Sequence, residues 1–349
     1  RFSTGSPLEE LRPASENGEQ PEEESDMTAR ERVMAVVNGK VPDRTPTMFT
    51  MHFPKECQTG EAAIAAHLEF FRESEGDIGK IMNENLLRSD ITAKAPGDLA
   101  KERINLNTKK GIDAQIDLVK RLVDQAAGDR MILATIHGPM VSIHHMSGRS
   151  GFFVENLDFY RTCKNEDPQA MQEALKYATE ALCELTRRCV EEAGADGIYF
   201  AALGAERSLF TREEYDEIVR PFDYLVFDAA RNAKGFNLLH ICKKDVDVQR
   251  FLDYPADVFN WEMIDRNATV EEALAFMPEN RTILGGFSNE SGPLLSGSYA
   301  EVEAGTKRLL AQVAGRRWIL GAGCTLPTGI DFARLRAVVK ASKDFVKTV

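Results

Sequence analysis

The sequence predicts an α/β fold, a (β/α)8 TIM barrel, and three observations lead to that prediction. Eight short apolar runs of β-type residues alternate with longer amphipathic runs from residue 27 onward. A strand that is repeatedly followed by a helix implies parallel strands with helices outside them. A chain of 349 residues with 43% hydrophobic residues can also build the sizeable core of one large barrel.

The eight predicted strands are short and apolar. They are residues 45–51, 77–82, 131–137, 196–201, 236–242, 257–262, 282–287 and 318–323. Eight parallel strands are the number that closes a barrel of this type.

Helical stretches lie between the predicted strands, and several begin at an Asp or Thr that suits a helix N-cap. We expect helices at residues 167–193, 211–233, 270–277, 299–314 and 331–346. The insertion between the second and third strands, residues 83–130, is long and polar and fits the alternation least well.

The first 26 residues are predicted to be a disordered acidic tail, and residues 27–349 to form the barrel. The tail holds eight acidic and two basic residues, so it carries half of the formal net charge of −12. Its Glu, Ser, Pro and Gly content leaves too few apolar groups to offset the entropy of ordering. The chain begins at Arg1, so the tail is either native or derived from expression.

Composition excludes several classes of function. The body of the chain is mildly acidic without a basic stripe, which argues against a nucleic-acid partner. No run approaches the roughly 18 apolar residues that span a bilayer, and the start lacks a secretory pattern. Six scattered cysteines are typical of a reduced intracellular protein. We therefore expect a cytoplasmic protein with neither nucleic acid nor membrane as a partner.

Candidate metal ligands stand at the ends of predicted strands. His240 and Cys242 end the fifth strand, and Cys324 follows the eighth. One imidazole and two thiolates favour zinc over magnesium or calcium and leave a fourth, exchangeable position. Because the carboxyl ends of barrel strands converge on one face, these residues should meet there with Glu262, which ends the sixth strand. The sequence thus predicts a catalytic zinc, with Glu262 as an oxygen ligand or catalytic group.

Each of these residues also has a structural interpretation. Cys324 can be a small core residue at a Gly-rich turn, because cysteine is among the most buried residue types. His240 can be a hydrogen-bonded histidine at the rim, and Glu262 a solvated carboxylate. The other four cysteines have no histidine partner nearby in the sequence, and we interpret them as structural.

Other polar residues follow predicted strands and are weaker candidates. His52 follows the first strand and His137 ends the third, so both are candidates for catalytic or substrate contact. Tyr199, Glu206 and Asn289 belong to the ends of the fourth and seventh strands and are candidates for cofactor contact. For the two histidines the alternative is a structural role, and for the other three it is a polar loop residue facing water.

Several segments resemble the uroporphyrinogen decarboxylase superfamily, over nearly all of the chain from residue 27. These segments are Thr28-Ala29-Arg30-Glu31-Arg32-Val33, Asn38 to Pro46, Gly194-Ala195-Asp196-Gly197-Ile198, Glu213 to Phe222, Leu239-His240-Ile241-Cys242 and Gly321-Ala322-Gly323-Cys324. The resemblance implies the barrel fold. Tetrapyrrole decarboxylases and corrinoid-dependent methyltransferases share that barrel but differ in their sites.

The residues favour the methyltransferase branch. Decarboxylases of the superfamily carry an Arg-rich segment after the first strand that grips substrate carboxylates, whereas residues 48–54 read Met-Phe-Thr-Met-His-Phe-Pro here. The His-x-Cys…Cys pattern is typical of members that move a methyl group from methylcobalamin to a thiol. Cobalamin-independent methionine synthases use a related His-x-Cys…Glu…Cys site, which supports Glu262 as a ligand.

The resemblance therefore implies a zinc-dependent methyltransferase that uses methylcobalamin or another corrinoid. It implies a corrinoid protein and a small-molecule methyl acceptor as partners, with a homodimer as one form of assembly. A tetrapyrrole decarboxylase and a non-catalytic corrinoid or tetrapyrrole carrier remain alternatives. A zinc hydrolase would place water in the same open position but would need a nearby general base.

Overall fold

The computed structural model describes residues 26–101, 106–126, 128 and 130–346, so nearly all of the predicted acidic tail lies outside the described residues. Eight parallel strands form one sheet in the order β1-β8-β7-β6-β5-β4-β3-β2. They are β1 (Thr47–Met48), β2 (Ile78–Ile81), β3 (Met131–His137), β4 (Gly197–Ala202), β5 (Leu238–Ile241), β6 (Val258–Trp261), β7 (Thr282–Phe287) and β8 (Trp318–Ala322). The predicted (β/α)8 barrel is confirmed.

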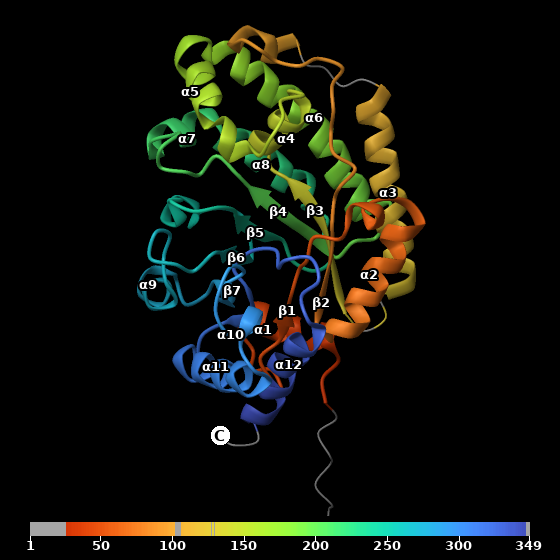
Figure 1. Ribbon diagram of the computed structural model, residues 1–349, viewed down its shortest axis with the longest axis vertical. Coiled ribbons are helices and arrows are strands. Elements are labelled where there is room, and N and C mark those ends of the chain that lie inside the picture. The colour runs from red at the N-terminus through yellow and green to blue at the C-terminus, as the bar shows by residue number, and fades with distance from the viewer. Residues whose placement is uncertain (1–25, 102–105, 127, 129, 347–349) are drawn as a thin grey trace, which may run out of the picture.

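Helices surround the strands (Figure 1). The α-helices are α1 (Ala29–Val37), α2 (Gly60–Ser74), α3 (Leu106–Ala126), α4 (Pro139–Met146), α5 (Leu157–Glu166), α6 (Pro168–Glu191), α7 (Arg212–Ile218), α8 (Arg220–Ala229), α9 (Val270–Phe276), α10 (Pro293–Ser296), α11 (Tyr299–Gln312) and α12 (Phe332–Val346). Four 3-10 turns join them, η1 (Lys55–Cys57), η2 (Pro96–Lys101), η3 (Phe153–Asn156) and η4 (Val248–Phe251). The insertion 83–130 is thus built around η2 and the long helix α3.

The inside of the barrel is a separate apolar core from the layer between strands and helices. Its buried members alternate along the strands, as the period of a strand requires. They include Met48, Ile78, Leu133, Tyr199, Leu238, Val258, Leu284 and Ile319. Val33 and Val36 of α1 pack into the same cluster, so this helix closes the amino-terminal end of the barrel. The carboxyl ends of the strands are left for a site.

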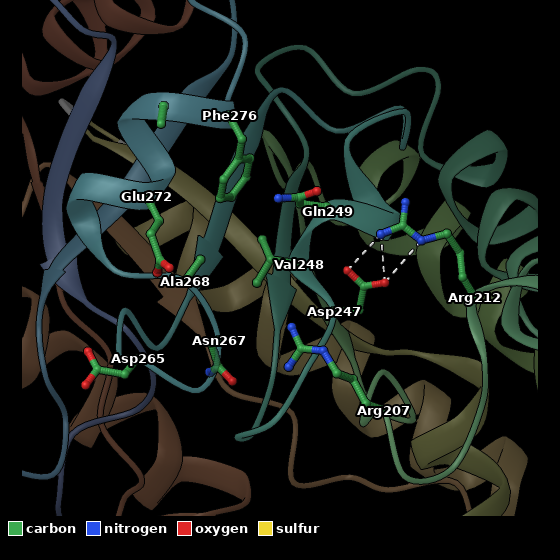
Figure 2. A pocket seen from close by; sticks show the side chains of 11 residues that line it. Arg207, Arg212, Asp247, Val248, Gln249, Asp265, Asn267, Ala268, Glu272 and Phe276 are labelled. Carbon is green, nitrogen blue, oxygen red and sulfur yellow. Dashed lines mark hydrogen bonds and ion pairs between the residues drawn. The ribbon is translucent and has the colours of Figure 1, made fainter.

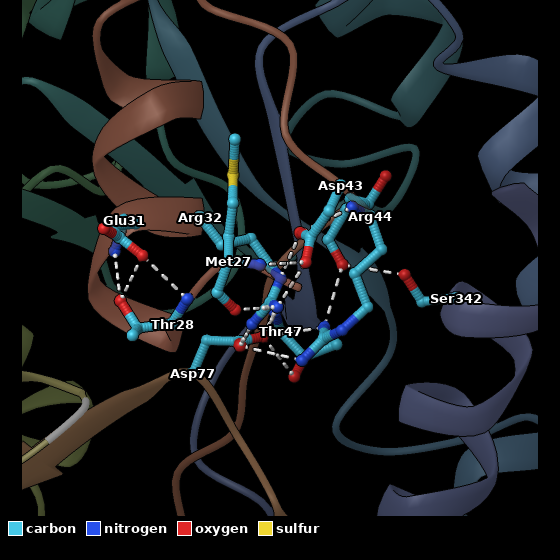
Figure 3. A network of polar contacts seen from close by, with 10 residues as sticks. Met27, Thr28, Glu31, Arg32, Asp43, Arg44, Thr47, Asp77 and Ser342 are labelled. Carbon is cyan, nitrogen blue, oxygen red and sulfur yellow. Dashed lines mark hydrogen bonds and ion pairs between the residues drawn. The ribbon is translucent and has the colours of Figure 1, made fainter. Parts of the chain in front are cut away.

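Buried charges join β1 to β2, where the barrel closes (Figure 3). Asp77 is 1% exposed, and its carboxylate accepts hydrogen bonds from Arg32 at 2.7 Å and from Arg44 at 2.8 and 2.9 Å. The backbone N–H of Thr47 also donates to Asp77 at 2.8 Å, while the N–H of Asp77 donates to the Thr47 carbonyl at 2.9 Å. Within the part of the chain that the structure describes, these contacts replace a regular β1–β2 ladder.

Two expectations about individual elements are corrected. The helix expected at 211–233 is two helices, α7 and α8, because Pro221 has no N–H to donate and disfavours helical geometry in the residue before it. The first strand is only Thr47–Met48, because residues 49–51 leave the ladder with β8. An isolated bridge joins Met51 to Leu326 beyond it.

No helix among the described residues is long and apolar enough to cross a membrane.

We predict that Asp77→Ala destabilises the barrel by about 3–5 kcal/mol, because it leaves the buried guanidinium of Arg44 without its carboxylate and that of Arg32 with Asp43 alone. Urea unfolding followed by circular dichroism measures the change. Asp43→Ala is the matched control, since Asp43 also binds Arg32 but its side chain is 23% exposed and Asp77 would remain. An equal loss in both variants would show that Asp77 has no special part in barrel closure.

Candidate metal centre and cavity

A cavity of about 440 Å³ opens at the carboxyl ends of the strands. His240, Cys242 and Cys324 line one side of it, and Lys80 and His137 from β2 and β3 line another. All five side chains stand on or directly after strands, so the barrel itself fixes their positions. The cavity therefore lies where barrel proteins place their reactive groups.

The three predicted ligands come together. The ligand atoms of His240, Cys242 and Cys324 all lie within 4.8 Å of one another. The Sγ atoms of the cysteines are 3.9 Å apart, and Cys324 Sγ is 3.4 Å from His240 Nε2. Tetrahedral zinc with its usual bond lengths needs ligand separations of about 3.5–3.8 Å. The donor set suits a zinc ion, and these two separations lie close to that range.

Asn260 holds the imidazole of His240 in the orientation that this fit requires. Its Oδ1 accepts a hydrogen bond from His240 Nδ1 at 2.6 Å, which leaves Nε2 to face the thiols. The Asn260 amide is itself fixed, because its Nδ2 donates to the carbonyls of Leu284 and Ala322 at 2.9 and 3.2 Å. Such support of a ligand histidine sets its tautomer and raises its basicity.

The two thiols do not ionise alike. The hydrogen bond from Cys242 lowers the pKa of Cys324 well below its usual value, and the nearby His240 acts in the same direction against burial. The same hydrogen bond raises the pKa of Cys242, and burial adds to that rise. Cys324 is thus the first of the pair to become a thiolate, the form that binds metals.

Glu262 lies outside the group of three whose ligand atoms converge, and it is not one of the residues that line the cavity. It is 4% exposed, and its Oε2 has no hydrogen-bond partner among the described residues. Burial raises the pKa of Glu262, opposed by the Ser288 hydroxyl and the Asn289 amide. An unpartnered buried carboxylate oxygen is costly, so this side chain is available to a ligand.

Three further candidates line the cavity. Tyr199 stacks on the His240 ring with centroids 5.3 Å apart. His137 is half-buried, and desolvation lowers its pKa to about 4, so its imidazole is neutral at pH 7. His52 lies at the exposed edge, where its Nδ1 is 3.4 Å from Glu84. The structure thus brings these three side chains to one cavity, and their roles stay predictions.

Two more candidates, like Glu262, lie away from the cavity lining. Asn289 donates from its side chain to the Thr325 carbonyl at 3.4 Å. Glu206 is 3% exposed and lines a separate hollow of about 380 Å³ that also contains Lys243. Burial raises the pKa of Glu206 to about 7. Neither side chain is brought to the group of three, and cofactor contact for both stays a prediction.

Several cavity residues escaped the sequence analysis, above all Lys80. It is 6% exposed, and its Nζ lies 4.1 Å from the centroid of the Tyr199 ring. Arg88, Arg149 and Lys243 add positive charge to the lining, whereas Glu84 is its acidic residue. The sequence signal for Lys80 was a lysine within an apolar predicted strand. A lysine in that position lies either at the edge of a sheet or at a functional site.

A second hollow of about 640 Å³ lies on the rim between η4 and α9 (Figure 2). Its two arginines are already paired, as Arg212 donates to Asp247 at 2.9 to 3.2 Å and Arg207 to the Arg266 carbonyl at 3.0 Å. None of the predicted site residues lines it. Although this hollow is larger, the barrel cavity is the better candidate site, because the predicted metal ligands line it.

The fold and the cavity define a class, a (β/α)8 barrel with a candidate soft-metal centre at its carboxyl rim. Residues 90–345 match the family model described as uroporphyrinogen decarboxylase (URO-D). That match covers more than half of the chain, and the chain belongs to this family. The resemblance found in the sequence motifs is confirmed.

The individual proteins that the chain resembles share a low sequence identity with it. The methylcobamide:CoM methyltransferase MtbA of Methanosarcina mazei is 24% identical over 227 residues, which are 65% of this chain and 62% of that protein. The chain therefore matches less than two thirds of the length of this relative.

Two solved structures share the fold. A methyltransferase from Methanosarcina mazei has a TM-score of 0.71 at 16% identity, covering 92% of this chain and 99% of the other. A B12-independent methionine synthase from Shewanella sp. W3-18-1, in complex with selenomethionine, has a TM-score of 0.56 at 12% identity, covering 87% and 97%. At these identities the likeness shows the barrel alone.

We predict that Asn260→Leu weakens zinc binding by about 10- to 100-fold, because His240 loses the acceptor that orients it. Competition with a chromophoric chelator measures the affinity. Asn260→Asp keeps an oxygen acceptor for His240 but loses the donation to Leu284 and Ala322, so a smaller loss of affinity than in the Leu variant is expected. Equal affinity in the parent and the Leu variant would contradict the role given to Asn260.

Proposed function

We propose that the protein is a zinc-dependent methyltransferase that moves a methyl group from a methylated corrinoid to the thiol of a small acceptor. The observation that carries this proposal is the convergence of His240, Cys242 and Cys324 on one cavity. The similarity to a methylcobamide:CoM methyltransferase supports it. The methionine synthase likeness adds only the shared fold.

The cavity residues would divide the work between binding and orientation. His240, Cys242 and Cys324 would hold zinc, with Glu262 beside them as a displaceable oxygen ligand. Bound zinc supplies positive charge that lowers the pKa of the acceptor thiol. Asn260 keeps Nε2 of His240 turned toward the centre. A donor set with two anionic sulfurs favours nucleophilic chemistry at sulfur over hydrolysis.

The methyl group would move from donor to acceptor in a single displacement step. The acceptor thiol would give up its proton to solvent, and its sulfur would form a bond to the methyl carbon as the bond from that carbon to the corrinoid donor breaks. The electron pair of that bond stays with the corrinoid. A cavity of about 440 Å³ suits a small acceptor, so we place the corrinoid on a separate partner protein. Cytoplasmic location and a homodimer stay predictions.

A tetrapyrrole decarboxylase is the second candidate function. Arg88 and Arg149 line the cavity, although the segment after the first strand has no arginine, and guanidinium groups suit substrate carboxylates. Loss of carboxylates from a porphyrinogen, measured chromatographically without added zinc, would favour this function over methyl transfer.

Cys324→Ala should remove both zinc and methyl transfer while the barrel stays folded, because one of two thiolate ligands is lost. Metal content per chain by mass spectrometry and the demethylation of methylcobalamin with a panel of thiols measure these effects. Cys183→Ala is the control, since Cys183 lies outside the cavity lining and its Sγ donates to the Leu225 carbonyl at 3.5 Å. Full activity in a zinc-free Cys324→Ala protein would overturn the mechanism.

Glu262→Gln should keep most of the zinc, because the other three ligands remain and the amide oxygen has nearly the same position. Methyl transfer should change more than metal content if the carboxylate leaves when the acceptor binds. The same two measurements apply, with circular dichroism to confirm folding. Complete loss of metal would instead make Glu262 a required structural ligand.

A further inference from the structure

The loop that directly follows Cys242 has a strained backbone. The φ angle is 82° at Lys243 and 60° at Asp245, so two of the three non-glycine residues with positive φ in the described part of the chain stand in this loop. Residues with a Cβ disfavour that left-handed region, and they stay in it only where surrounding contacts hold them. Contacts from outside the loop must therefore hold the backbone beside this candidate metal ligand.

The side chain of Asn267 supplies such contacts. Asn267 lies between β6 and α9 (Figure 2) and is 7% exposed. Its Nδ2 donates a hydrogen bond to the Lys243 carbonyl at 3.0 Å, and its Oδ1 accepts one from the backbone N–H of Val246 at 3.2 Å. Both ends of the strained loop are thus tied to one buried amide.

The same amide also holds the backbone of Glu262. Nδ2 of Asn267 donates a second hydrogen bond, to the Glu262 carbonyl, at 3.0 Å. The side chain therefore faces two carbonyl acceptors with its NH2 group and one N–H donor with its oxygen, and only one orientation of the amide satisfies all three. Asn267 joins the segment after β5 to the segment after β6.

Asn267 is itself fixed by the barrel. Its backbone N–H donates to the Ile264 carbonyl at 2.9 Å. Trp261, the buried last residue of β6, donates from its indole N–H to the carbonyl of Ala268 at 2.8 Å. Because the backbone on both sides of Asn267 is held in this way, the side chain can hold the loop after Cys242 in place.

We propose that Asn267 is a positioning residue of the candidate metal centre, and that it acts on Cys242 through the backbone of Lys243. This inference rests on the proposed function, since it assumes that Cys242 binds zinc. Without Asn267, Lys243 can relax to a negative φ, and the peptide group that joins it to Cys242 rotates. The Cys242 thiol then leaves the arrangement in which its Sγ lies 3.9 Å from that of Cys324.

The zinc affinity of the full chain, measured by competition with a chromophoric chelator, tests the proposal. Asn267→Ala should bind zinc about 10- to 100-fold more weakly than the parent. Asn237→Ala is the matched control and should keep the parent affinity. Asn237 is half-buried and accepts a hydrogen bond from the Ile198 N–H at 3.2 Å, but it precedes β5 and so lies at the end of that strand opposite Cys242.

Circular dichroism and urea unfolding check that the variants are folded. If Asn267→Ala does not fold, Asn267→Asp is measured in its place. This variant keeps the acceptor for the Val246 N–H but loses both donated hydrogen bonds, so the same loss of zinc affinity is expected.

Two double variants separate the backbone conformation of Lys243 from its charge. Asn267→Ala with Lys243→Gly should bind zinc about 10-fold more tightly than Asn267→Ala with Lys243→Ala, because glycine adopts a positive φ without steric cost. Neither protein has the ammonium group, so charge cannot explain the difference. With saturating Co²⁺ in place of zinc, the thiolate charge-transfer absorption should be weaker in Asn267→Ala and partly restored by Lys243→Gly. A residue that only stabilised the fold would change neither measurement.

Equal zinc affinity in the parent and in Asn267→Ala, or in the two double variants, would overturn the proposal. Methyl transfer by the parent separates this failure from failure of the proposed function. If zinc affinity depends on Asn267 but no methyl group is transferred, only the proposed function fails. If methyl groups are transferred and Asn267→Ala binds zinc as tightly as the parent, only the role of Asn267 fails. A parent that binds neither zinc nor Co²⁺ would overturn both.

Discussion

The carboxylate of Asp77 is the constraint on which the rest of the barrel depends. Seven strand pairs are held by regular ladders, but β1 and β2 meet through Asp77, Arg44 and Thr47. If β1 shifted by one residue relative to β2, a buried charge in this cluster would lose its partner. An apolar contact between the strands could shift without that cost. Arg32 joins the same carboxylate from α1. Closure of the barrel and coverage of its amino-terminal end are therefore one interaction.

Once the barrel is closed, strand alternation determines what lies at its carboxyl end. Leu238 points into the apolar interior, so His240 and Cys242, at steps of two, point to the same side above it. Register adds the neighbour, because His240 pairs with Asn260 across β5 and β6. A histidine and the amide that orients it are thus fixed by backbone pairing before any side chain is placed.

The sequence predicted the eight strands and the convergence of His240, Cys242 and Cys324, because apolar runs and soft ligands at strand ends are local signals. It did not predict Asn260 or Lys80, since the part each plays depends on which strand lies beside it. Pro221 shows a signal that was present and overlooked, as it divides the predicted helix at 211–233. The positions of loop residues such as Asn289 were harder to predict, because a residue that follows a strand can point its side chain toward the cavity or away from it.

The charges of the cavity suggest a part for Lys80, which stands on β2 and lines the same cavity as the cysteines. Two thiolates would balance a zinc dication, so an acceptor thiolate would leave the centre with one excess negative charge. A cation in direct contact with that sulfur would stabilise it and reduce its nucleophilicity. Nζ of Lys80 instead lies over Tyr199, which itself contacts His240. Lys80 would then lower the cost of negative charge in the cavity while leaving the sulfur free to react.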